Sequence, residues 1–176
     1  MISQTELEQF FEDLVAKVQS KGGKCAITSG MACVQYGVAI STKDCDILCS
    51  PDSMQSLFRL LVNTEFLGVN CSYRGHLTAP LDQRWQRGGW TSHFQGKHGG
   101  DFAHLDVFGV APRATSSWEL ETRGLLASMH TVAEMKRTDR PKDWPFADAL
   151  GVKLIEAADL RGWLHMMPQS SLILEL

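Results

Sequence analysis

The chain contains no apolar run long enough to cross a membrane, although 44% of its 176 residues are hydrophobic. It also lacks the pattern of a secretory signal peptide, because its first ten residues are polar and acidic. Internal repeats and low-complexity tracts are missing as well. These absences predict a cytoplasmic globular protein without membrane contact, built as one domain or as one domain with a small appendage.

Disulfide and zinc signatures are equally scarce. None of the five cysteines forms a Cys-x-x-Cys pair, and an odd number in apolar surroundings fits buried thiols in a reducing compartment. His93, His98 and His104 are close in sequence, but no second ligand pair has the spacing of a structural zinc site. The formal net charge of −3 lacks the positive excess typical of duplex nucleic-acid binding, although positive residues gather at 83–90 and 136–142.

Helical and strand-like patterns alternate along the chain. An amphipathic helix over residues 3–20 begins with a capping box formed by Ser3 and Glu6. Ser50 and Pro51 are typical of the start of another helix. Further helices are expected at 31–37, 52–64, 126–137 and 146–160. Strands are expected at 25–28, 44–49, 68–75, 90–95 and 102–110.

This order of elements favours an α/β (α+β) fold with a mixed β-sheet flanked by helices. We expect a core at residues 1–115 that carries the sheet. A C-terminal helical segment at 116–176 is expected to pack on that core. The apolar tail at 171–176 hints at burial against the domain or against a partner.

Two aspartates interrupt the apolar stretch DCDILC. Asp44 and Asp46 are two residues apart, so on a strand their side chains share one face. An unpaired buried charge costs roughly several kcal/mol, so something is expected to neutralise these carboxylates. A bound divalent cation would do so, although an isolated Asp-x-Asp pair also arises by chance.

Two other segments give this pair a chemical context. A Ser29-Gly30 turn lies between a buried strand and a helix, where free backbone N–H groups suit a phosphate. Asp106, within HLDVF, adds a third carboxylate in apolar surroundings, and Asp101 after two glycines is its rival. Two adjacent carboxylates and a third on a neighbouring strand can hold two Mg²⁺ ions about 3.5–4 Å apart around a transferring phosphoryl group.

These segments, TSGMACVQYGVAISTKDCDIL and HLDVF, resemble the minimal nucleotidyltransferase fold of the polymerase-β-like superfamily. The resemblance is closest to a bacterial branch that includes stand-alone nucleotidyltransferases, abortive-infection toxin-like proteins and relatives of aminoglycoside nucleotidyltransferases. The stretch VAEMKRTDRPKDWPFAD is similar to the C-terminal helix pair of that branch. The matched segments lie at 28–48, 104–108 and 132–148.

The resemblance implies Mg²⁺-dependent transfer of a nucleoside monophosphate from a nucleoside triphosphate to an acceptor hydroxyl. Asp44 and Asp46 would bind both of two Mg²⁺ ions, and Asp106 would bind the ion nearest the acceptor. The residues that would hold or shape the nucleotide site are Ser29, Gly30, Thr42, Lys43, Lys136 and Arg140.

Departures from the family pattern leave alternatives open. Ser29 stands where glycine is commoner, and Ile40 stands where an arginine often contacts phosphate. The acceptor could be a small molecule, an RNA or a protein, with the loop at 74–100 as its candidate binding segment. A homodimer or an antitoxin-like partner is conceivable. The alternatives to a transferase are a two-metal phosphohydrolase or nuclease and a non-catalytic module of a toxin–antitoxin pair.

Overall fold

The computed structural model describes residues 3–61, 70–73, 84, 87, 91–98, 101–109 and 121–166. The α-helices are α1 (Gln4–Gln19), α2 (Ser29–Gln35), α3 (Met54–Leu61), α5 (Met129–Lys136) and α6 (Trp144–Glu156). Short 3₁₀ helices are η1 (Pro51–Ser53), η2 (Pro141–Asp143) and η3 (Leu160–His165). The strands are β1 (Cys25–Thr28), β2 (Asp44–Cys49), β3 (Asn70–Tyr73), β4 (Thr91–His98), β5 (Asp101–Phe108), β6 (Thr122–Arg123) and β7 (Leu126–Ala127).

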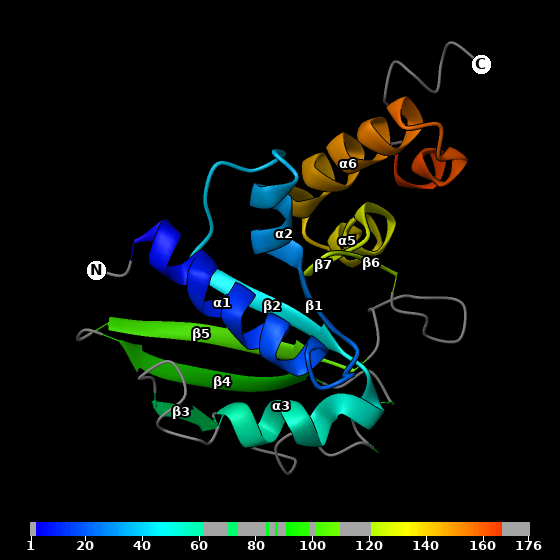
Figure 1. Cartoon of the computed structure of the whole chain (residues 1–176). Helices are drawn as coiled ribbons and strands as arrows, with labels where there is room; N and C mark the ends of the chain where they lie inside the picture. Colours follow the sequence, from blue (N-terminus) through cyan, green and yellow to red (C-terminus); the bar gives the residue numbers. More distant parts are fainter. Residues whose placement is uncertain are drawn as a thin grey trace.

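The strands form one mixed sheet in the order β3-β4-β5-β2-β1-β7-β6 (Figure 1). In its centre, β2 pairs antiparallel with β1 and parallel with β5. The hairpins β3–β4 and β4–β5 extend one side, and β7 adds a parallel partner to β1 on the other. The α/β (α+β) fold class predicted from the sequence is therefore confirmed.

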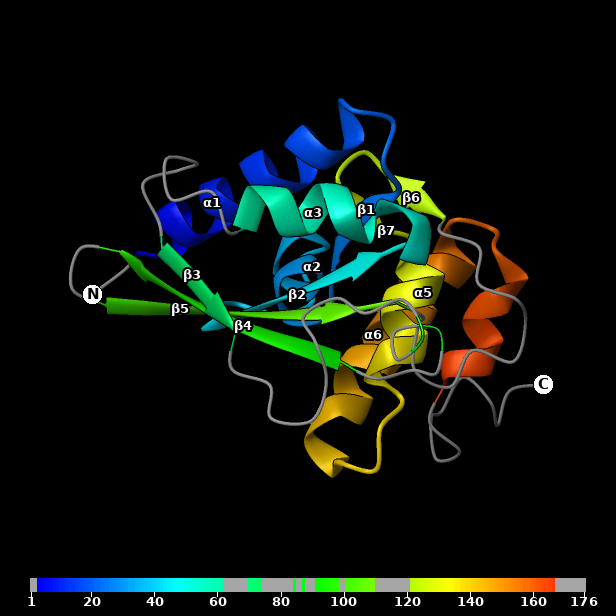
Figure 2. The same cartoon turned by 90° about the horizontal axis from the view of Figure 1, so that it is seen from below.

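One face of the sheet is covered by α1 and α3, which lie on the same side of it (Figure 2). Alternate strand residues supply this core, because successive side chains on a strand point to opposite faces. The buried strand residues that pack with the two helices are Cys25, Ile27, Cys45, Ile47, Cys49, Phe94, Leu105 and Val107.

The opposite face carries the residues between them. Over β1 and β7 it packs against α2, α5 and α6 in a second cluster that includes Ala26 and Leu150. Over β2 and β5 it carries Asp44, Asp46 and Asp106, followed along the strands by the apolar Leu48 and Phe108. The strands at the centre of the sheet thus have one apolar face and one face that turns acidic at one end.

The predicted start of the first helix is confirmed. Ser3 caps α1, with its hydroxyl accepting from the Glu6 backbone N–H, while the Glu6 carboxylate accepts from the backbone N–H of Ser3 at 2.9 Å. The predicted strand at 25–28 and the strand at 44–49 also have the bounds expected from the sequence. Strong local signals therefore placed these three elements correctly.

Later boundaries differ from the expected ones. The helix expected at 126–137 begins only at Met129, because Ser128 is its N-cap and accepts a hydrogen bond from the backbone N–H of Thr131. Leu126 and Ala127 form β7, joined to β6 by a turn at Gly124, whose φ is +64°. The segment after residue 116 is therefore not only helical, since it also adds two strands to the sheet.

Other bounds shift by a few residues. The helix expected from 31 begins at Ser29, and the strand expected at 90–95 continues to His98. The helix expected at 146–160 begins at Trp144 and ends at Glu156. The expected helix end at 62–64, most of the loop at 74–100, the division at 115/116 and the tail at 171–176 lie outside the described residues. No helix in the described ranges has the length and apolarity that a bilayer span requires.

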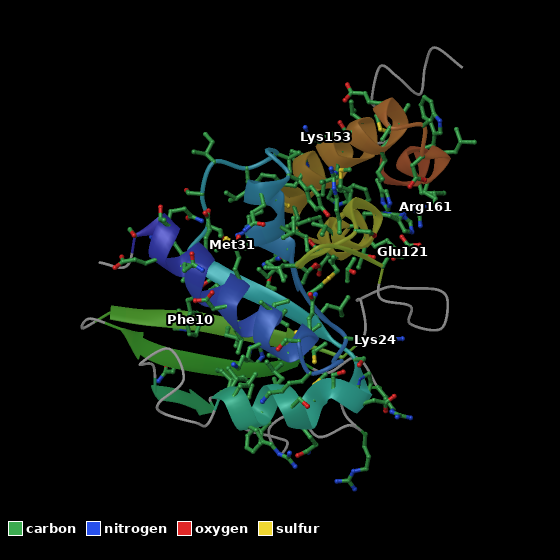
Figure 3. The ribbon with its side chains drawn as sticks, in the orientation of Figure 1. Phe10, Lys24, Met31, Glu121, Lys153 and Arg161 are labelled. Carbon is green, nitrogen blue, oxygen red and sulfur yellow. The ribbon has the colours of Figure 1, made fainter. Side chains whose placement is uncertain are left out.

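The C-terminal helices meet through two glycines. A Cβ on Gly162 in η3 would collide with the carbonyl oxygen of Gly151 in α6, and one on Gly151 would lie 2.8 Å from the carbonyl oxygen of Gly162. Arg161 secures the same element, because its guanidinium contacts Glu121 at 2.8 Å and Asp159 at 2.7 Å (Figure 3). Glycine is therefore required where α6 and η3 pack backbone to backbone.

We predict that Gly162→Ala lowers the free energy of unfolding by about 1–3 kcal/mol, because the added methyl group forces α6 and η3 apart. Chemical denaturation followed by circular dichroism measures this loss. The control is Leu164→Ala in the same 3₁₀ helix, where the side chain is 58% exposed and the expected change is small. Equal stability of Gly162→Ala and the unmodified protein would contradict the close packing.

Candidate functional site

A cavity of about 690 Å³ lies between the acidic face of β2 and β5 and the chain from α5 to α6. Its walls come from segments far apart in the sequence. The sheet side and the α2–β2 connection contribute Ser29, Gly30, Cys33, Ala39, Ser41, Thr42, Asp44, Asp46, Asp106 and Phe108. The helical side contributes Met135, Lys136, Thr138, Arg140, Lys142, Asp143 and Phe146.

Parallel pairing of β2 with β5 brings the three predicted carboxylates together. Asp46 is the register partner of Asp106, and Asp44 is two residues earlier on the same face. Asp44 is exposed, Asp46 is partly buried, and the Asp106 side chain is 38% exposed. All three line the same cavity, as the sequence pattern predicted.

The rival carboxylate Asp101 begins β5 opposite His98. It is five residues before Asp106, which corresponds to about 17 Å along an extended strand. The backbone therefore places Asp106, and not Asp101, beside Asp46.

Burial and crowding of negative charge dominate the electrostatics of Asp46. The pKa of this carboxyl is raised from 3.8 to about 6, first by desolvation and also by the nearby charges of Asp106 and Asp44. A hydrogen bond from the Ser29 hydroxyl and the charge of Lys136 act in the opposite direction. The site thus concentrates more negative charge than its own protein partners compensate.

The Ser29-Gly30 turn joins β1 directly to α2. Ser29 has a φ of +52°, in the left-handed region that favours glycine, and its hydroxyl donates to Asp46. A Cβ on Gly30 would lie 2.6 Å from the Thr42 Oγ1. The departure from glycine at position 29 therefore gives Asp46 a hydrogen-bond donor, and the glycine at position 30 makes room for Thr42.

Thr42 shapes the entry to β2. Its hydroxyl donates to the carbonyl oxygen of Asp44 at 3.1 Å, and its backbone N–H donates to Gln4 Oε1 at 3.2 Å. Lys43 is exposed and is not among the lining residues of the cavity. Ile40 is 97% exposed on the same connection, so its side chain adds no charge to the cavity wall.

The helical wall of the cavity is organised by Asp143. This buried carboxylate accepts from the Thr138 hydroxyl at 2.8 Å and from Arg140 Nε at 2.7 Å, and it lies 3.5 Å from Lys136 Nζ. Burial would raise its pKa, but these hydrogen bonds and positive charges hold the pKa below its usual value. Lys136 is largely buried, with its ammonium 5.6 Å from the ring centre of Phe146.

His93 is a site residue for which the sequence gave no specific role. It lies opposite Asp106 on β4, with Nδ1 at 2.7 Å from Asp106 Oδ1. The signal that could have located it is the Gly99-Gly100 pair. A two-residue hairpin loop there would place residues 93 and 106 opposite each other.

The donor set of the site suits a hard divalent cation. Carboxylate oxygens are the ligands that Mg²⁺ prefers, and a cation would relieve the charge repulsion that contributes to the raised pKa of Asp46. Among the described residues, no group of three or more His, Cys, Asp and Glu side chains is already close enough to hold a metal. Binding of Mg²⁺ by Asp44, Asp46 and Asp106 together would require at least one of these side chains to rotate.

No family model matches the chain, and no curated protein is significantly similar to it. The resemblance to nucleotidyltransferases, and the roles that it implies for individual residues, therefore stay predictions.

We predict that Asp46→Asn stabilises the metal-free protein near neutral pH by roughly 2–3 kcal/mol, because it removes a charge whose burial is poorly compensated. Because the pKa of the Asp46 carboxyl is raised on folding, this group makes the unmodified protein less stable as pH rises through the interval from 3.8 to about 6. The stability that Asp46→Asn gains should thus be small near pH 3.8 and complete above about pH 6. Thermal unfolding in EDTA across this range measures it, and a destabilised variant at neutral pH would contradict the charge crowding.

We also predict that Gly30→Ala lowers the free energy of unfolding by about 1–3 kcal/mol, because its methyl group displaces the Thr42 hydroxyl. The double variant Gly30→Ala/Thr42→Ala should recover part of this loss, and Thr42→Ala alone is the control. A double-mutant cycle from denaturation curves gives the coupling between the two positions. Strictly additive changes would show that the two residues do not compete for space.

Proposed function

We propose that the protein is a Mg²⁺-dependent nucleotidyltransferase that moves a nucleoside monophosphate from a nucleoside triphosphate to an acceptor hydroxyl. The observation that carries this proposal is the convergence of Asp44, Asp46 and Asp106 on one wall of a cavity whose other wall carries Lys136 and Arg140. In-line phosphoryl transfer requires carboxylates that can bind metal ions on one side of the phosphate and positively charged side chains on the other.

In this proposal the carboxylates have distinct tasks. Asp44 and Asp46 on β2 would hold the cations, and Asp106 would hold the cation nearest the acceptor and would help to remove the acceptor's hydroxyl proton. Bound Mg²⁺ would activate the acceptor hydroxyl and stabilise the departing pyrophosphate. The protein itself contributes position and charge, with little covalent chemistry of its own.

The helical wall would bind the triphosphate. Lys136 Nζ is 3.5 Å from Asp143, which is longer than the 2.7–2.9 Å typical of a strong charge-assisted hydrogen bond. An ammonium group has three N–H donors, so Lys136 can donate to a phosphate oxygen while it stays beside Asp143. Arg140 binds Asp143 through Nε and has a side chain 59% exposed at the rim of the cavity, which suits contact with an anionic substrate.

The size and lining of the cavity support a nucleotide as the ligand. Small-molecule sites commonly have volumes of about 300–1,000 Å³, and this cavity of about 690 Å³ falls in that range. Phe146, Met135 and Phe108 add apolar surface to the charged walls, which suits a nucleobase. The acceptor, a small molecule, an RNA or a protein, remains part of the proposal, as do a cytoplasmic location and a homodimer or antitoxin-like partner.

The test incubates the protein with each of the four ribonucleoside triphosphates, labelled at the α-phosphate, together with Mg²⁺ and a cell lysate. We expect pyrophosphate release and label in one acceptor class, and we expect both to fall to background in Asp44→Asn. Asp52→Asn is the matched control, because Asp52 is an exposed carboxylate paired with Arg87 outside the cavity, and it should behave as the unmodified protein.

Other outcomes point to the alternatives. Release of inorganic phosphate without label transfer, again dependent on Asp44, would favour a two-metal phosphohydrolase or nuclease. A binding module would show neither product. Mg²⁺ with a nucleoside triphosphate should also raise the unfolding temperature. At a ligand concentration 100 times Kd, the expected gain in the free energy of unfolding is about 2.7 kcal/mol. No shift in the unmodified protein, together with no turnover, would overturn the proposed function.

A further inference from the structure

We propose that His93 is a positioning residue for Asp106: its Nδ1–H fixes Oδ1 and leaves the second carboxylate oxygen to face the cation. This inference rests on the proposed function, because it assigns a residue to the metal site proposed there. It concerns a histidine that the sequence pattern did not connect to the carboxylates.

The contact is short and comes from a neighbouring strand. His93 Nδ1 lies 2.7 Å from Asp106 Oδ1, and the two residues are register partners in the antiparallel pair β4–β5. A carboxylate oxygen can only accept, so the imidazole tautomer that makes this bond carries its proton on Nδ1. One oxygen of Asp106 is thereby committed to the protein.

The contact completes a row of residues across the sheet. Thr28, Asp46, Asp106 and His93 are successive register partners on β1, β2, β5 and β4. The Ser29 hydroxyl, next to Thr28, donates to Asp46 from one side, and His93 donates to Asp106 from the other. The two central carboxylates are thus bracketed by one side-chain donor each.

Asp106 needs such a donor more than Asp46 does. Asp46 is held by burial as well as by Ser29, whereas the Asp106 side chain is 38% exposed and its carboxylate would otherwise rotate. Carboxylates that bind metals are usually oriented by hydrogen bonds from a second layer of residues, whose loss typically costs about 10–100-fold in metal affinity or activity.

A purely stabilising role explains the contact less well. The His93 side chain is 47% exposed, and exposed polar contacts of this kind contribute little to stability. A role in stability would appear in the unfolding temperature, whereas a role in positioning would appear in metal affinity at unchanged stability. The two roles can therefore be separated.

The experiment compares two polar variants of the full chain, His93→Asn and His93→Gln. The amide nitrogen of asparagine occupies nearly the position of Nδ1, whereas that of glutamine reaches to the position of Nε2. Binding of Mn²⁺ alone, followed by the electron paramagnetic resonance signal of the free ion, measures metal affinity without turnover. Gln95→Asn is the control, because Gln95 is on the same strand face but lies opposite His104.

We expect His93→Gln to bind Mn²⁺ about 10–100-fold more weakly and His93→Asn to keep most of the affinity, with similar unfolding temperatures for both. In the transfer assay, kcat at subsaturating Mn²⁺ should follow the same order and recover at saturating Mn²⁺. Equal affinity of both variants, whether unchanged or reduced, would overturn the positioning role.

The outcome for the proposed function is read separately. If the unmodified protein binds Mn²⁺ and Asp44→Asn does not, but both His93 variants bind normally, only the role of His93 fails. If neither the unmodified protein nor Asp44→Asn binds Mn²⁺, the proposed metal site fails and the role of His93 fails with it.

Discussion

The parallel pairing of β2 with β5 is the interaction on which the site depends. It places Asp46 directly beside Asp106, with Asp44 one step along the same face. These carboxylates repel each other, and burial makes their charge more costly, as the raised pKa of Asp46 reflects. The fold tolerates this cost because Cys45, Ile47, Leu105 and Val107, on the other face of the same strands, are buried against α1 and α3. The hydrophobic face stabilises the strands, and the acidic face is free to serve chemistry.

The sequence predicted the parts of the site that are local. An alternating strand with Asp44 and Asp46, a small-residue turn before a helix and a third aspartate among apolar neighbours could all be read from spacing, and the structure brings these residues to one cavity. Asp106 was preferable to Asp101 because of its apolar neighbours, and the register of β2 with β5 gives the geometric reason. Lys43, which directly precedes β2, is the residue of the set that does not line the cavity.

What the sequence could not provide is the arrangement of distant segments. The hairpin β6–β7 has strands of two residues, too short for any periodicity to appear, so residues 126–127 were assigned to a helix. The contact between His93 and Asp106 depends on the register of β4 with β5, for which the Gly99-Gly100 pair gives only a local signal. The balance of charges around Asp143 involves three residues spread over a turn, and their spacing alone fits a surface salt bridge as well as a cavity wall.

The β6–β7 hairpin, which the sequence did not predict, helps to determine the position of the helical wall of the cavity. Because β7 pairs parallel with β1, Ser128 is held at the edge of the sheet, and α5 must begin there. The Tyr36 hydroxyl, which donates to the carbonyl oxygen of Ala127 at 2.6 Å, ties the end of α2 to the same point. An eight-residue helix then advances about 12 Å, which carries Lys136 to the cavity and close enough to lower the pKa of Asp46. The two-residue strand β7 is too short to stabilise the fold by itself, but it helps to set the distance between the carboxylates and the Lys136 ammonium.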